Sequence, residues 1–148
     1  MANKQFGDVS RLDILNSLRF NNGLTLVSLT ATQLLQTMNH GVAAWSATAT
    51  PGAFPQVSGI RFRFDPKRPI NNRVTELMVV DSAGTVLDVI AQRGMVAGNP
   101  NRLIRVVSLN FLVDQAGTGP NGGDGYPFNA FVLANPTQAN KVSITKGN

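Results

Sequence analysis

The spacing of apolar residues over the first part of the chain predicts a short helix followed by a strand. Apolar residues recur at three- and four-residue intervals from about residue 11 to 18. Ser10 and Asp13 stand at the start of this stripe with the spacing of a capping box. After an Asn-Asn-Gly turn, the apolar segment 24–29 is typical of a strand.

A second helix is the clearest element in the sequence. Thr30 and Gln33 repeat the capping-box spacing. The apolar residues that follow share one helical face: Leu34, Leu35, Met38 and Val42. His40 lies near the C-terminal end of this helix and has no acidic residue close to it in sequence. We therefore interpret it as a capping or buried, hydrogen-bonded histidine rather than a catalytic one.

Beyond a loop at 47–55, the period of the pattern changes to two, which predicts strands. The segments that show it are 57–64, 73–80, 85–90 and 103–109, with a hairpin turn at 81–84 joining the middle pair. A mobile polar insertion is predicted at 114–121. With no repeat and no long linker, residues 1–148 are predicted to form one α+β domain, in which a mixed sheet is covered by helices.

Composition removes several classes of chemistry. The chain has 148 residues, 43% of them hydrophobic, and this is enough to bury a core. It contains no cysteine and one histidine, so thiol nucleophiles, zinc–thiolate sites and histidine-rich metal sites are excluded. The eight acidic residues are scattered without a pair at a catalytic spacing. No apolar run is long enough to span a membrane, and the first eight residues lack the apolar segment of a signal peptide.

The formal charge of +5 is concentrated in one part of the sequence. Five of the thirteen basic residues are Arg61, Arg63, Lys67, Arg68 and Arg73. Such a cluster can attract phosphates or an acidic surface. Because Arg61 and Arg63 alternate with apolar residues, the solvated face of a half-buried strand is the favoured interpretation, and an anion site is the alternative.

An aromatic residue and a glycine-rich turn form the candidate binding site. Phe111 comes directly after the last predicted strand, and Gly122-Gly123-Asp124-Gly125-Tyr126 follows the polar insertion. Gly123 and its glycine neighbours permit positive φ and close backbone approach, while Asp124 supplies a hydrogen-bond acceptor. A ring face beside a carboxylate suits a purine or pyrimidine base. The alternative is a plain turn next to a core phenylalanine.

The order of several motifs resembles the C-terminal domain of the 5′-nucleotidases. These motifs are Leu18-Arg19-Phe20-Asn21-Asn22, Leu29-Thr30-Ala31-Thr32-Gln33-Leu34, Asn39-His40-Gly41-Val42, Phe54-Pro55-Gln56-Val57-Ser58-Gly59-Ile60-Arg61-Phe62, Asp65-Pro66, Asn110-Phe111-Leu112 and Gly122-Gly123-Asp124-Gly125-Tyr126. The resemblance covers residues 9–128 and implies the four-layer α/β/β/α arrangement of that family.

The resemblance implies a role for each candidate site residue. It assigns a base sandwich to Phe20 and Phe111, a hydrogen bond on the ribose side of the ligand to Asp124, and a pocket-shaping role to Asn110. The ligand is then a nucleoside or nucleotide, and this chain is the substrate-binding half of a hydrolase. It carries no cofactor itself, since two divalent metal ions and the catalytic residues belong to a separate N-terminal metallophosphatase domain.

The resemblance also implies that the parent protein is periplasmic or extracellular. The family has an Asn-Gly-Gly-x-Arg-like segment just upstream of the first helix, and residues 1–9 contain no counterpart. We therefore expect a domain truncated at its N-terminus. Since an exposed sheet edge tends to recruit another chain, self-association as a homodimer is expected.

Two other functions compete with this one. A basic nucleic-acid-binding module would use Arg61, Arg63 and exposed rings, and would show strong salt dependence. A structural or oligomerising domain would bind no nucleotide at any concentration.

Overall fold

The computed structural model describes residues 7–17, 20, 22–49, 51–115 and 123–144. In chain order, its elements are α1 (Arg11–Ser17), β1 (Leu24–Thr30), α2 (Ala31–Gly41), β2 (Ile60–Phe64), β3 (Val74–Val80), β4 (Val86–Gln92), β5 (Met95–Val96), β6 (Leu103–Leu109), α3 (Asn110–Asp114), the 3₁₀ turn η1 (Gly123–Gly125), α4 (Phe128–Ala134), α5 (Pro136–Ala139) and β7 (Val142–Ile144).

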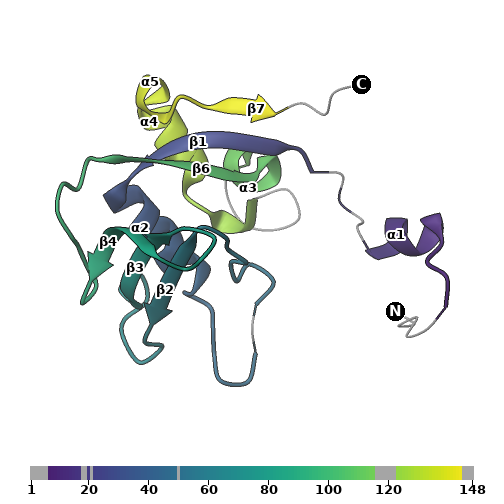
Figure 1. Cartoon of the computed structure of the whole chain (residues 1–148), viewed down its shortest axis with the longest axis horizontal. Coiled ribbons are helices and arrows are strands. Elements are labelled where there is room, and N and C mark those ends of the chain that lie inside the picture. The colour runs from purple at the N-terminus through teal and green to yellow at the C-terminus, as the bar shows by residue number, and fades with distance from the viewer. Residues whose placement is uncertain (1–6, 18–19, 21, 50, 116–122, 145–148) are drawn as a thin grey trace.

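The strands form two sheets, which Figure 1 shows on either side of α2. One sheet has the order β6-β1-β7 and the other β2-β3-β4-β5. The described ladders are all antiparallel. The predicted α+β class is confirmed. The strands are divided between two antiparallel sheets where the sequence suggested one mixed sheet, because α2 lies between them and packs against both.

The helix α2 begins where the sequence predicts it, at a capping box formed by Thr30 and Gln33. The Thr30 hydroxyl accepts a hydrogen bond from the Gln33 amide at 3.1 Å, and the Gln33 side chain accepts one from the Thr30 amide at 2.9 Å. This capping box satisfies donors that the first turn would otherwise leave unpaired. Buried Asn39 then joins α2 to β3, because its Oδ1 accepts a hydrogen bond from the Val74 amide at 2.8 Å.

The C-terminal end of α2 is held by Arg73. Its Nη1 donates to the carbonyls of Val42, Ala43 and Trp45, at 3.1, 2.7 and 3.1 Å. These carbonyls follow the helix and have no partner within it. Arg73, one of the clustered basic residues, therefore has a structural role.

The alternation in β2 is confirmed. Phe62 and Phe64 face inward and pack with Phe54, at ring centroid distances of 6.0 to 6.4 Å, while Arg61 and Arg63 are exposed. Arg63 pairs with Glu76 at 3.5 Å. The strand begins at Ile60 and not at 57, because Gly59 has a φ of +73° and interrupts the extended run.

Other short elements were not predicted from the sequence. The helical turn α3 begins directly at Asn110, and β5, α4, α5 and β7 add to the predicted set. Residues 116–122 of the predicted polar insertion lie outside the described residues. Side chains from β1, α2, β3, β4, α3, α4 and α5, with Val42 after α2 and Tyr126 after η1, meet in one core: Val27, Leu29, Ala31, Leu34, Leu35, Met38, Val42, Val74, Leu77, Ile90, Ala91, Val113, Tyr126, Phe128 and Ala139.

Candidate functional site

The glycine-rich turn packs directly on α3. Gly123 and Gly125 have φ values of +59° and +71°, as the sequence predicts for this turn. A Cβ atom on Gly123 would lie 2.8 Å from the carbonyl oxygen of Phe111. Only glycine combines this backbone conformation with so close an approach. The turn and Phe111, separated by the insertion in sequence, thus lie against each other.

Asp124 projects from this turn into solvent. It is exposed and has a φ of +55°, a left-handed conformation that aspartate tolerates better than most residues. Within the described part of the chain, its carboxylate forms no hydrogen bond or ion pair, so it can accept hydrogen bonds from a ligand.

His40 supports the turn from the end of α2. Its Nε2 donates a hydrogen bond to the backbone carbonyl of Asp124 at 2.8 Å, which fixes the Nε2–H tautomer because a carbonyl only accepts. The imidazole also meets the ring of Tyr126 edge-on, with centroids 4.8 Å apart. The prediction of a hydrogen-bonded histidine is confirmed. Its partner could not be predicted, because it lies 84 residues away.

Tyr126 anchors the far side of the turn. Its hydroxyl donates to the carbonyl of Ala53 at 2.8 Å. Burial, and then the negative charge of Asp124, raise the pKa of Tyr126 to about 12. Gly41 leaves room for the ring, since a Cβ there would lie 2.6 Å from the tyrosine oxygen. The sequence motifs contain Tyr126 and Gly41, but they predicted no role for either residue. The sequence did carry a signal for Tyr126, because this residue is the single tyrosine and directly follows the glycine-rich turn.

Asn110, the first residue of α3, connects α3 to Gly23, the residue before β1. Its side-chain Oδ1 accepts a hydrogen bond from the backbone N–H of Gly23 at 2.9 Å, and its backbone N–H donates to the Gly23 carbonyl at 3.0 Å. The structure therefore brings together Asn110, Phe111, Gly123 and Asp124. Phe20 lies three residues before Gly23, close in sequence to this junction.

The two phenylalanines predicted to form the sandwich differ in exposure. Phe20 is 82% exposed and Phe111 is partly buried. Within the described residues, neither ring stacks on another aromatic side chain. The assignment of base binding to this pair stays a prediction.

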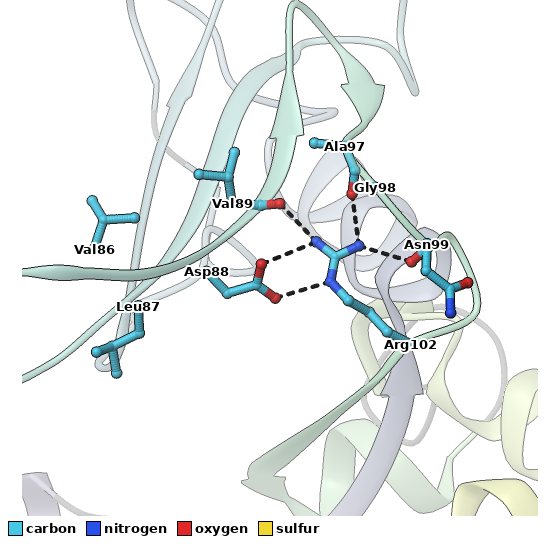
Figure 2. A pocket seen from close by; sticks show the side chains of 8 residues that line it. All are labelled: Val86, Leu87, Asp88, Val89, Ala97, Gly98, Asn99 and Arg102. Atoms are coloured by element: carbon cyan, nitrogen blue, oxygen red, sulfur yellow. Dashed lines mark hydrogen bonds and ion pairs between the residues drawn. The ribbon is translucent and has the colours of Figure 1, made fainter.

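A separate concavity of about 580 Å³ lies between β4 and the segment that leads into β6. Figure 2 shows that Arg102 fills its polar side. The guanidinium bonds to the carboxylate of Asp88 at 2.9 Å and to the carbonyls of Val89, Ala97 and Asn99 at 2.6 to 2.7 Å. With these donors occupied, Arg102 holds β4 to the loop that leads into β6 and is not an anion-binding group.

Within the described ranges, no three His, Cys, Asp or Glu side chains are grouped so that they could hold a metal ion. The same part of the chain has no helix long and apolar enough to cross a membrane.

Comparisons with known proteins agree on one family. Residues 1–119 match the family model described as "5'-nucleotidase, C-terminal domain", a range that includes Phe20, Asn110 and Phe111 and stops before Gly123 and Asp124. "Protein 5NUC" of Lutzomyia longipalpis is 32% identical over 120 residues, covering 81% of this chain and 19% of that protein. The "Trifunctional nucleotide phosphoesterase protein YfkN" of Bacillus subtilis is 30% identical over 120 residues, covering 81% of this chain and 7% of that protein.

Two solved structures share the fold. The 5′-nucleotidase precursor from Thermus thermophilus aligns with a TM-score of 0.62 and 30% identity, over 88% of this chain and 21% of its own. The NAD nucleotidase (NadN) of Haemophilus influenzae aligns with a TM-score of 0.64 and 18% identity, over 91% of this chain and 21% of its own. This chain thus spans about a fifth or less of each of these proteins. Both the sequence match and the fold show that the chain belongs to the family of 5′-nucleotidase C-terminal domains.

Proposed function

We propose that this domain binds the nucleoside part of a nucleotide for a metal-dependent 5′-nucleotidase. The observation that carries this proposal is the packing of the Gly123–Gly125 turn on α3, which places the exposed carboxylate of Asp124 on the same turn that contacts the backbone of Phe111. An aromatic residue and an acceptor on segments that touch suit a nucleoside, whose base stacks and whose hydroxyl groups donate.

Phe20 and Phe111 are the rings proposed to hold the base. Phe20 comes shortly before Gly23, which is hydrogen-bonded to Asn110, so both rings belong to segments that meet at Asn110. Hydrolysis is assigned to a separate metallophosphatase domain that would hold two divalent metal ions, and a periplasmic or extracellular location of the parent protein is part of the same proposal.

A nucleic-acid-binding module is less well supported. Phe62 and Phe64, which alternate with the arginines of β2, pack against the core instead of facing solvent, and stacking on bases requires exposed rings. Arg63 is paired with Glu76, which reduces its attraction for phosphates.

Titration calorimetry with adenosine tests the proposal. Base stacking contributes about 1–3 kcal/mol per ring, so Phe20→Ala and Phe111→Ala should each weaken binding roughly tenfold or more. Leu87→Ala, in β4 and 66% exposed, is a matched control for loss of an exposed apolar side chain and should bind as the unchanged protein does. Equal adenosine affinity in all four proteins would contradict the sandwich, and no binding to any of them would contradict the proposed function.

A further inference from the structure

The sheet β6-β1-β7 has one face on the core, and its other face is open near Leu24 and covered near Ser28 and Thr30, which are buried. Val27 and Leu29 of β1 lie opposite Val106 and Ile104 of β6 and point into the core. The alternate positions point the other way. The apolar residues among them form a surface at one end of this face, here called the outer face, made of Leu24, Leu26, Val107, Leu109, Val142 and Ile144. All but Leu26 are between 39% and 54% exposed, which is unusual for a contiguous set of large apolar residues.

The helix α1 also leaves apolar side chains uncovered. Leu12 and Leu15, three residues apart, lie on one side of it. Both, like Ile14, are at least 50% exposed, and none of the residues of α1 is buried. Figure 1 shows α1 apart from the other elements. A seven-residue helix is far too short to be stable in water by itself, so an amphipathic helix of this length needs a surface to pack on.

The outer face is within reach of α1 in the same chain. Six residues join Ser17 to Leu24, and Leu24 is itself part of the outer face. Six residues can span up to about 20 Å, whereas a seven-residue helix is only about 10 Å long. A segment tethered this closely has an effective concentration in the millimolar range, which favours it over a second copy of the chain.

We propose that α1 docks through Leu12 and Leu15 on the outer face of its own sheet, and that this docking holds Phe20 beside the Asn110–Asp124 site. The second half rests on the proposed function. Phe20 lies between α1 and β1 in the chain, so fixing α1 on the sheet restricts where its ring can go. A ring that is already in place removes an ordering cost from ligand binding.

Cross-linking tests the docking directly, because the chain has no cysteine of its own. The test protein carries Leu15→Cys and Leu26→Cys. A matched control carries Ser17→Cys with the same Leu26→Cys, since Ser17 lies on the polar side of α1. Both are treated with a short bismaleimide at low protein concentration, after thermal unfolding has shown that both are folded.

Docking predicts a cross-linked monomer in the Leu15 variant, at a yield at least several-fold above that of the Ser17 control. Equal yields in the two proteins, or a product that is only a dimer, would overturn it. Adenosine should bind the cross-linked Leu15 variant roughly threefold or more tightly than the uncross-linked protein, because more of the population is competent to bind. An unchanged adenosine affinity after cross-linking would overturn the link between docking and Phe20. If adenosine binds neither before nor after cross-linking, the proposed function is wrong. The docking of α1 is then decided by the cross-linking yields alone.

Discussion

Tyr126 reports on the state of the binding turn, because it is the only tyrosine in the chain. It packs against His40, donates to Ala53 and follows the turn that carries Asp124. These contacts connect α2, the loop before β2 and the turn. Ionisation of this side chain should therefore be visible in the ultraviolet absorbance spectrum of the protein.

The titration of Tyr126 should be displaced to high pH. Burial and the charge of Asp124 raise the pKa of Tyr126 to about 12, from an ordinary value near 10. The folded state therefore binds this proton more tightly than the unfolded state. Its contribution to stability is fully present below pH 10 and is lost as the pH rises from about 10 to 12.

Ultraviolet absorbance of tyrosinate measures this midpoint. Asp124→Asn should lower it partly, since the carboxylate charge is the smaller of the two causes and burial remains. A midpoint near 10 in the folded protein would show that the ring is not buried as described.

Among the elements, α2 and the Gly123–Gly125 turn depend on the absence of a side chain at Gly41. A Cβ there would lie 2.6 Å from the Tyr126 oxygen and 2.8 Å from the Cδ of Pro55. Gly41→Ala should therefore destabilise the protein by about 1–3 kcal/mol, the usual cost of overpacking, although alanine favours helix.

Chemical denaturation of Gly41→Ala and Gly52→Ala measures this effect. A Cβ added at Gly52 would meet no atom within 4 Å, and the residue has no positive φ, so its replacement should leave the free energy of unfolding unchanged. If both variants were equally stable, the close packing of α2 against Tyr126 would be wrong.

Sequence patterns predicted the elements whose determinants are local. The capping box of Thr30 and Gln33 acts within four residues, and the hairpin at 81–84 needs only Asp81 and a glycine with positive φ. The helical turn α3 and the strands β5 and β7 were not predicted, because each has five residues or fewer and too little pattern to recognise.

The candidate site was predicted only in part, for a related reason. Gly123 carries its own signal, since a run of glycines beside aspartate indicates positive φ. The contact of His40 with the carbonyl of Asp124 and that of Asn110 with Gly23 join residues 84 and 87 positions apart. Such contacts are set by tertiary packing, and no local pattern encodes them.

At the scale of the whole molecule, we expect the outer face to decide whether the protein associates with itself in solution. The sequence predicts self-association through an exposed sheet edge. The outer face offers an apolar surface for the same association whenever α1 is not packed on it. The state of α1 should therefore decide between monomer and dimer.

Charged residues on the apolar side of α1 should turn the protein into a dimer. In the double variant Leu12→Asp, Leu15→Asp, the helix can no longer cover Leu24, Val107 and Val142, so two copies are expected to bury these side chains against each other. Light scattering over a range of protein concentrations measures the mass. Ser17→Asp, on the polar side, should leave the mass unchanged, and adding Leu26→Asp to the double variant should restore the monomer, because a charge at the centre of the outer face opposes burial. A double variant that stays monomeric at every concentration would show that the outer face does not drive association.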